Sequence, residues 1–175
     1  GWREYLSHTL LGDEQQIRKI FSLLQKDEPY GIVYPQNYHL LPYWANTWLA
    51  NEPLAREWGR RIGLTSIPRG YFDYPAGSMF WARVEALAPL FNAGIRLEDF
   101  PEEAGQTDGT LAHVLERFLA LCTLEKGWQP AIIADATFPS WSSWRLEQYI
   151  NRPYESIIEL LTIPTIKLIA FDIFD

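Results

Sequence analysis

A run of acidic residues leads into the strongest helical pattern of the chain and holds the side chains best suited to polar chemistry. The stretch EDFPEEAGQTDGTLAHVLER, residues 98–117, is rich in carboxylates before its helical part begins. Acidic loops are usually solvated, but Asp108 stands at the predicted start of the helix. A carboxylate there accepts hydrogen bonds from free backbone N–H groups. Asp108 is therefore predicted to be the N-cap of that helix.

Three polar residues follow on the helix face opposite its apolar side. His113 precedes Glu116 by three residues and Arg117 by four, so these side chains are neighbours. Asp108, His113 and Glu116 could therefore line one wall of a cleft. The same spacing also fits a solvated face with local ion pairs. No HExxH pattern, cysteine cluster or glycine-rich phosphate loop occurs, so no metal site is predicted from these residues.

A second segment, residues 71–87 (YFDYPAGSMFWARVEAL), surrounds the small-residue turn Gly77-Ser78 with aromatic side chains. A buried strand explains the apolar residues after the turn, but it does not explain the turn. Alternation along a strand puts Trp81 and Arg83 on one face. The ring of Trp81 could stack on a sugar, or it could belong to an aromatic-rich core. No histidine close in sequence could activate Ser78, so a hydrolase triad is not favoured.

Helical and strand patterns alternate along the chain, which predicts a layered α/β domain. The apolar spacing at residues 2–26 predicts one or two helices with a break at Gly12-Asp13. Further helices are predicted at about 44–62, after the second strand to about 94, at 110–126 and at 140–162. Strands are predicted at 31–35, 77–85, 130–138 and 165–175.

The charge of the chain argues against nucleic-acid binding. The net charge is −7 and the pI is about 5.0, whereas sequence-independent binding to a phosphate polymer needs clustered Lys and Arg. Arg60 and Arg61 could still contact one phosphate or an anionic membrane. The single cysteine, Cys122, cannot form an internal disulfide, which fits the cytoplasm. No run of residues is apolar enough to span a membrane.

Two motifs in order resemble a known family. Residues 75–87 (PAGSMFWARVEAL) and 102–117 (EEAGQTDGTLAHVLER) resemble the rhamnan synthesis protein F family, bacterial glycosyltransferases that build rhamnose-containing cell-surface polysaccharides. The amino-terminal stretch GWREYLSHTLLGDEQQIRKIFSLLQKDEPYGIVYP is similar to the Trp-Arg helix, second helix and strand of that family. The resemblance covers residues 1–150. It implies an α/β domain resembling the acceptor-side half of a GT-A-like glycosyltransferase.

The resemblance also implies roles for the polar residues. The turn before the strand would let the backbone approach the donor sugar, since Gly77 has no Cβ. Asp108, and after it Glu103, would be the base that takes the proton of the acceptor hydroxyl. The turn at 75–78 and the helix start near Thr110 should then border one cleft. Implied substrate-binding residues are Gly77, Ser78, Trp81, Arg83, His113 and Glu116, with Trp81 stacking on a pyranose and Arg83 meeting a phosphate or carboxylate.

The implied partners are a nucleotide-sugar donor, expected to be dTDP-rhamnose, and a glycan or lipid-linked glycan acceptor. A divalent metal, Mg²⁺ or Mn²⁺, could accompany the nucleotide sugar. The expected location is the cytoplasm, with peripheral association at the inner face of the membrane. A non-catalytic carbohydrate-binding or scaffold module that uses the Trp-rich surface is the alternative function.

Two domain assignments follow. Residues 1–163 are predicted to be a glycosyltransferase-like domain without the donor-binding half that precedes the Trp-Arg helix in the family. Residues 164–175 are predicted to be a terminal strand and the start of a further domain. The run IKLIAFDIFD resembles the first motif of the haloacid dehalogenase superfamily, in which a strand delivers a nucleophilic Asp, here Asp172. A plain terminal strand and a metal-binding pair of Asp172 and Asp175 are the alternatives.

Overall fold

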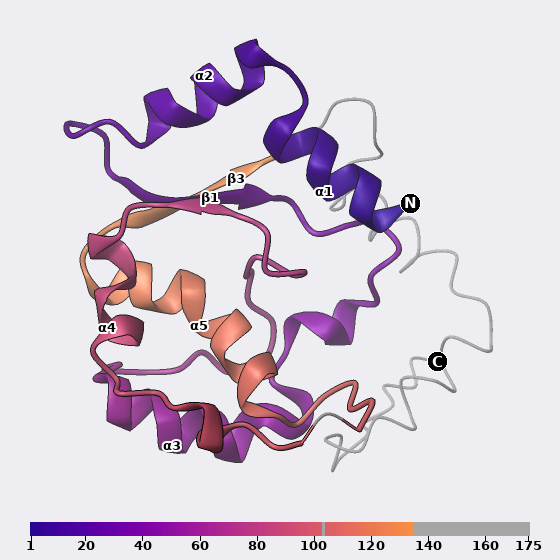
Figure 1. The fold of residues 1–175 in the computed structure, drawn as a ribbon, viewed down its shortest axis with the longest axis vertical. Coiled ribbons are helices and arrows are strands. Elements are labelled where there is room, and N and C mark those ends of the chain that lie inside the picture. The colour runs from indigo at the N-terminus through magenta and orange to yellow at the C-terminus, as the bar shows by residue number, and fades with distance from the viewer. Residues whose placement is uncertain (103, 135–175) are drawn as a thin grey trace, which may run out of the picture.

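A computed structural model of the chain describes residues 1–102 and 104–134 (Figure 1). The elements, with 3-10 turns labelled η, are α1 (Trp2–Leu11), α2 (Glu14–Leu23), β1 (Tyr30–Pro35), η1 (Tyr43–Asn46), η2 (Leu49–Asn51), α3 (Glu52–Ile62), β2 (Trp81–Ala82), η3 (Glu85–Leu87), α4 (Ala88–Phe91), η4 (Leu97–Asp99), α5 (Leu111–Glu125) and β3 (Gln129–Ile133).

Strand β1 is the centre of the sheet. It pairs antiparallel with β2 and parallel with β3, so the strand order is β2-β1-β3. Its residues, YGIVYP, are all buried except the half-buried Tyr30. A strand covered on both faces is expected to be a continuous apolar run, and this pattern predicted β1 correctly.

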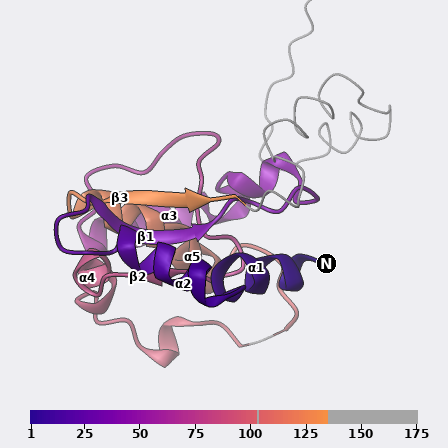
Figure 2. The ribbon, with the colours of Figure 1, turned by 90° about the horizontal axis from the view of Figure 1, so that it is seen from above.

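The sheet separates two helical layers. On one face, Val33 packs with Leu10 of α1 and Ile20 of α2. On the other face, Ile32 packs with Ala120 of α5. Figure 1 shows α1 and α2 above the sheet and α5 below it, and Figure 2 shows the same two layers from above. The predicted α/β class is therefore confirmed for the described residues.

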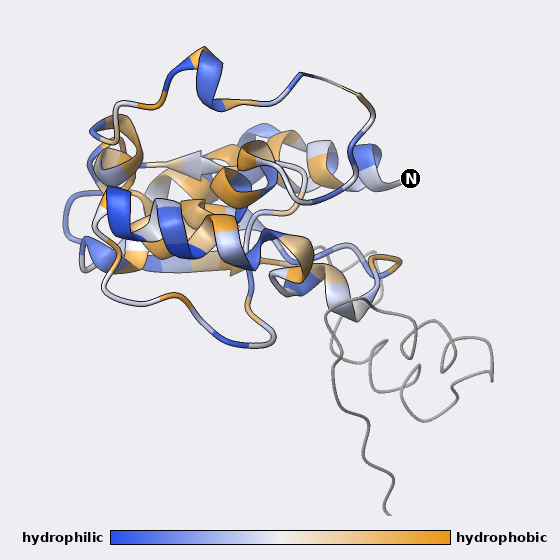
Figure 3. Ribbon diagram, turned by 90° about the horizontal axis from the view of Figure 1, so that it is seen from below, coloured by the Kyte–Doolittle hydropathy of each residue, from blue (hydrophilic) through white to orange (hydrophobic). Residues whose placement is uncertain are grey.

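Helix α3 covers the far side of α5. Its buried residues are Ala55, Trp58, Gly59 and Ile62, which follow the spacing of one helical face. Hydrophobic and hydrophilic residues alternate along the same helix in Figure 3. The predicted end at Gly63 is confirmed, because this residue has a φ of 82° and forms a left-handed cap.

The start of β1 lies where three side chains from other segments converge. A Cβ on Gly31 would lie 2.6 Å from Cβ of Trp128 and 2.8 Å from both Cβ of Ala86 and Cγ2 of Thr123. Any larger residue would push these groups apart. Glycine at this position therefore allows β1 to pack against the end of α5 and against η3.

The break predicted at Gly12-Asp13 is confirmed. Asp13 is the N-cap of α2, and its carboxylate accepts a hydrogen bond of 2.8 Å from the backbone N–H of Gln16. The side-chain amide of Gln16 donates to the carbonyl of Thr9 in α1 at 2.8 Å. These bonds fix the corner between the two helices.

The strand predicted over residues 77–85 is much shorter, because β2 comprises Trp81–Ala82 alone. Gly77 and Ser78 have φ values of 89° and 54°, in the left-handed region that an extended strand excludes. The helix predicted to follow, up to about Gly94, is divided into η3 and α4.

The helix predicted over about residues 44–62 begins only at Glu52. Before it, Asn46 and Phe72 exchange two hydrogen bonds: the Asn46 amide donates to the Phe72 carbonyl at 3.1 Å, and the Phe72 N–H donates to the Asn46 carbonyl at 2.9 Å. Leu49 also has a φ of 49°. Bonding to a distant segment thus replaces the helical pattern here.

The strongest predicted helix, residues 110–126, is confirmed as α5. Its apolar side buries Leu111, Val114, Phe118 and Cys122 against α3. Within the described ranges, none of the helices combines the length and the apolar composition that a membrane crossing requires.

The carboxyl-terminal predictions fall largely outside the described residues. Strand β3 matches the first part of the strand predicted at 130–138. The rest of that strand, the helix at 140–162 and the strand at 165–175 with Asp172 lie beyond residue 134, where the description ends.

Burial of two titratable groups in this core predicts a loss of stability at alkaline pH. Burial raises the pKa of Cys122 from 9.0 to about 12 and that of Tyr74 from 10.0 to about 12. As the pH rises, these groups lose their protons in the unfolded chain before they do so in the folded one. Their contribution to the free energy of unfolding is therefore fully present below pH 9 and is lost as the pH rises toward 12. In urea unfolding from pH 8 to 11, the free energy of unfolding should decline with pH. The decline should be shallower in Cys122→Ala, by up to about 1.4 kcal/mol per pH unit for the one proton removed. Equal declines in the two proteins would contradict this.

Candidate functional site

The turn at residues 75–78 packs directly against helix α1. The N–H of Ser78 donates to the carbonyl of Pro75 at 2.9 Å, which closes the turn. A Cβ on Gly77 would lie 2.8 Å from Cδ1 of Leu6 and 3.2 Å from Cζ2 of Trp2. The space left by the missing side chain is therefore filled by α1. This finding corrects the expectation that the missing side chain of Gly77 makes room for a donor sugar, because side chains of α1 occupy the space.

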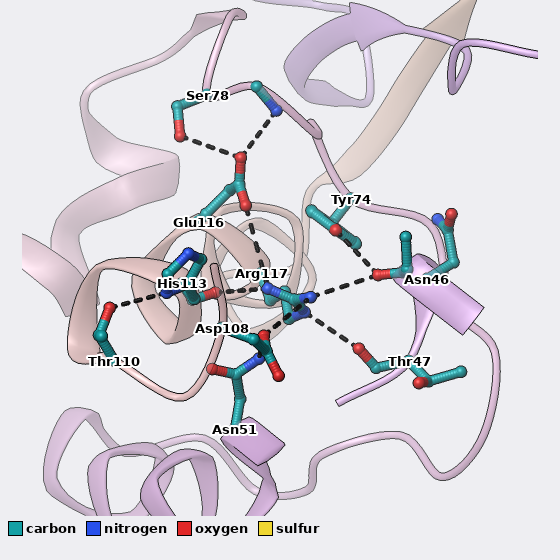
Figure 4. Close-up of polar contacts among 12 residues, drawn as sticks. Asn46, Thr47, Asn51, Tyr74, Ser78, Asp108, Thr110, His113, Glu116 and Arg117 are labelled. Carbon is teal, nitrogen blue, oxygen red and sulfur yellow. Dashed lines mark hydrogen bonds and ion pairs between the residues drawn. The ribbon is translucent and has the colours of Figure 1, made fainter. Parts of the chain in front are cut away.

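Glu116 connects this turn to α5 (Figure 4). Its Oε1 accepts a hydrogen bond of 2.7 Å from the N–H of Gly77 and one of 3.3 Å from Oγ of Ser78. The side chain is only 18% exposed. The structure thus brings the turn into contact with the second turn of α5. A common cleft with the start of this helix stays a prediction.

Arg117, the next residue, is buried and not on a solvated face. Its guanidinium donates to three backbone carbonyls: Nε to Thr47 at 3.0 Å, Nη1 to His113 at 3.0 Å and Nη2 to Ala45 at 3.3 Å. It also lies 4.8 Å from the ring centre of Tyr74. The prediction that Arg117 lies on the helix face opposite the core is therefore wrong. A guanidinium can be buried when its donors are satisfied in this way.

Asp108 is not the N-cap of α5, since that position is occupied by Thr110. The carboxylate of Asp108 accepts a hydrogen bond of 3.0 Å from the N–H of Ala50 and another from the side-chain amide of Asn51. Its Oδ1 lies 3.8 Å from Nη2 of Arg117. The Asp108 carboxylate, two residues before the N-cap of α5, therefore joins the segment that leads into α3 to α5.

His113 lies beside Arg117 and Asp108, and Figure 4 marks no bond between His113 and Asp108. Its Nδ1 is 2.7 Å from Oγ1 of Thr110, and its side chain is half-buried. We call the set Gly77, Ser78, Asp108, Glu116 and Arg117 the α5 polar cluster. His113 stands at the edge of this cluster.

Trp81 and Arg83 lie apart from the α5 polar cluster. The indole N–H of Trp81 donates to the carbonyl of Leu10 at 3.2 Å, and its ring meets that of Phe21 edge-on at 5.2 Å. Arg83 donates to the carbonyls of Tyr30, at 2.8 Å, and of Gln25. Both side chains are half-buried and are engaged in internal contacts with or near the amino-terminal helices.

The remaining predicted base, Glu103, lies outside the described residues. Within the described ranges, no three His, Cys, Asp or Glu side chains gather in a way that could hold a metal ion. The α5 polar cluster therefore offers two carboxylates and one guanidinium for chemistry.

Asn51 is the part of this arrangement that the sequence does not reveal. The run Asn51-Glu52-Pro53 has the form of a helix start, with Pro in the first turn. However, the Asn51 side chain donates to Asp108 and accepts a hydrogen bond of 2.9 Å from the N–H of Gly109. A cap-like pattern gives no indication of a bond to residues almost sixty positions away.

The two layers around a parallel and antiparallel sheet, with polar residues joining two distant motifs, define a small α/β domain. The family model for rhamnan synthesis protein F matches residues 1–128. The chain belongs to this family.

Two curated relatives come from Xanthomonas campestris pv. campestris, strains B100 and ATCC 33913, and both are named "Uncharacterized protein WxcX". Each is 35% identical to this chain over 127 residues, which is 73% of the chain and 18% of the relative. The chain thus spans less than a fifth of the length of these proteins. No solved structure matches the chain.

The packing at Gly77 gives a stability prediction with a matched control. Gly77 and Gly63 have φ values of 89° and 82°, but a Cβ on Gly63 would meet nothing within 4 Å. Gly63→Ala should cost about 1 kcal/mol for the left-handed backbone alone. Gly77→Ala should cost more in urea unfolding, because its Cβ also meets Leu6. The excess should shrink in a Leu6→Ala background, and equal costs for the two glycines would show that α1 does not pack on the turn.

Proposed function

We propose that this chain is the acceptor-side part of a glycosyltransferase that moves a rhamnosyl group from a nucleotide sugar, dTDP-rhamnose, to a glycan or lipid-linked glycan. The reaction takes place in the cytoplasm, at the inner face of the membrane. Membership of the rhamnan synthesis protein F family supports the substrate class. The proposal extends to the complete protein, of which a donor-binding part would supply the nucleotide site.

One observation carries the proposal: the two motifs typical of the family meet at Glu116. The carboxylate of this residue binds the Gly77-Ser78 turn, while its neighbour Arg117 lies 3.8 Å from Asp108. Residues almost forty positions apart in sequence are thereby held at one place. A sugar transfer needs a base and substrate-positioning groups within reach of one reacting centre.

In the proposed reaction, an acceptor hydroxyl oxygen attacks the anomeric carbon of the donor sugar. The bond between that carbon and the diphosphate oxygen breaks, and the diphosphate leaves with the electron pair. Asp108 takes the hydroxyl proton, with Glu103 as the second candidate. Asp108 accepts hydrogen bonds from Ala50 and Asn51, which leaves further lone pairs on a carboxylate that is 21% exposed.

Arg117 is a positioning residue in this proposal. Its guanidinium holds Asp108 at 3.8 Å and lies 3.9 Å from Glu116. Because the described residues do not gather metal ligands, no step is assigned to a metal. The internal packing of Trp81 also gives less support to the alternative, a binding module that uses open aromatic faces.

The test is transfer of labelled rhamnose from dTDP-rhamnose by the full-length protein and its variants. Asp108→Asn should lower the rate by about 10²-fold or more, the scale of a lost general base. The same change weakens the bonds to Asn51 and Arg117, so the urea midpoint should fall as well.

Asn51→Ala is the control, because it removes the bond between Asn51 and Asp108 and keeps the Asp108 carboxylate. It should lower the urea midpoint and retain far more transfer than Asp108→Asn. If the two variants lose transfer equally, Asp108 is a structural residue and not the base. If the wild-type protein transfers no sugar from any nucleotide-activated deoxysugar, the proposed function is wrong.

A further inference from the structure

Trp2, the first residue of α1, is an exposed tryptophan that lies beside the Gly77-Ser78 turn. It is 39% exposed. A Cβ on Gly77 would lie 3.2 Å from Cζ2 and 3.6 Å from Cε2 of Trp2. The indole therefore combines a contact with the turn and a surface that is open to solvent.

The ring of Trp2 carries no stacking partner, unlike other tryptophans of the fold. Within the described ranges, its indole N–H donates to no protein group, and no ring or guanidinium lies over it. Trp58 and Trp128, in contrast, have guanidinium groups over their rings, from Arg61 at 4.1 Å and from Arg83 at 4.4 Å. The exposed surface of Trp2 is thus available for a ligand to stack on.

Polar groups of the α5 polar cluster lie next to this ring. Oγ of Ser78 is 3.3 Å from Oε1 of Glu116, which also accepts a hydrogen bond of 2.7 Å from the N–H of Gly77 (Figure 4). Gly77 and Ser78 are exposed, and the side chain of Glu116 is 18% exposed. The Ser78 hydroxyl can still accept a hydrogen bond while it donates to Glu116. Trp2, the turn and Glu116 therefore form one continuous surface from three segments of the chain.

The chemistry of this surface selects a neutral sugar. A pyranose ring presents apolar C–H faces, which suit an aromatic ring, and hydroxyl groups that both donate and accept. Ser78 and Glu116 offer the matching polar atoms beside Trp2. The Glu116 carboxylate and the net charge of −7 oppose a phosphate here.

We infer that Trp2 is the platform on which a neutral pyranose of the acceptor glycan stacks, while Ser78 and Glu116 bind its hydroxyl groups. The inference rests on the proposed function, in which the acceptor is a glycan, and it names the residue that holds this sugar. The family resemblance implied the same role for Trp81, whose ring packs on the amino-terminal helices. Trp2 takes that role because the fold brings the start of α1 to Gly77.

The test measures sugar binding by the full-length protein, with methyl α-L-rhamnopyranoside as the probe in an NMR titration. Trp2→Ala should weaken binding by about tenfold, the scale of one lost stacking contact. Trp2→Phe keeps an aromatic face and should retain most of the affinity. Ser78→Ala should weaken binding by about fivefold, for one lost hydrogen bond.

Phe91→Ala is the matched control for the loss of an exposed ring. Phe91 is 67% exposed and belongs to α4, which lies at the opposite side of the domain from the start of α1 (Figure 1, Figure 2). Its loss should leave the affinity for the rhamnoside unchanged. Trp58→Ala is the control for stability, because Trp58 is 5% exposed. The urea midpoint of Trp58→Ala should fall far below that of Trp2→Ala.

Wild-type affinity in Trp2→Ala would overturn the inference, as would an equal loss of affinity in Phe91→Ala. A wild-type protein that does not bind the rhamnoside would also overturn it. The same holds for a urea midpoint of Trp2→Ala as low as that of Trp58→Ala, because another part of the full-length protein would then cover Trp2.

Transfer of labelled rhamnose separates this inference from the proposed function. The expected binding pattern without any transfer would keep the Trp2 platform, reject the proposed function and favour the carbohydrate-binding module. Transfer by the wild-type protein, together with unchanged affinity in Trp2→Ala, would reject the platform and leave the proposed function in place.

Discussion

The burial of Arg117 is the interaction on which the rest of the described structure depends. Its side chain is 5% exposed, yet it carries a charge at all relevant pH values. Three backbone carbonyls and the carboxylates of Asp108 and Glu116 surround it. Removing the partner of a buried charge costs about 3–5 kcal/mol, so the segments that supply these groups are held firmly to α5. Two of the carbonyls come from Ala45 and Thr47, which explains why this part of the chain forms bonded turns and not the helix that its sequence predicts.

The position of Glu116 follows from that of Arg117. Successive residues on a helix point about 100° apart, because there are 3.6 residues per turn. Once Arg117 is fixed in the interior, Glu116 must point along the neighbouring direction, where it meets Gly77 and Ser78. The contact between the two family motifs is therefore a consequence of the rotation of one helix. On the other side of Arg117, Asp108 is held by Ala50 and Asn51.

Local patterns in the sequence predict the elements well, and they fail where a distant contact decides the outcome. The break at Gly12-Asp13, the apolar strand β1 and the buried face of α5 all depend on neighbours in sequence, and all are confirmed. Asp108 has the local pattern of a cap, but its partners Ala50 and Asn51 lie far away in sequence. Trp81 has the pattern of a stacking platform, whereas its ring packs on the amino-terminal helices. The pairing of the two motifs was predictable only through the family resemblance, since neither motif contains a signal for the other.

Amide hydrogen exchange at Gly77 tests most directly whether α5 joins the two motifs. Gly77 is exposed, so its N–H should exchange quickly unless it is bonded to Glu116. We expect slow exchange in the wild-type protein and a rate close to that of an unprotected amide in Glu116→Ala, with exchange in the β1 core unchanged. Glu116→Gln keeps an accepting oxygen and should retain most of the protection. Rapid exchange in the wild type, or equal rates in the wild type and Glu116→Ala, would contradict the account.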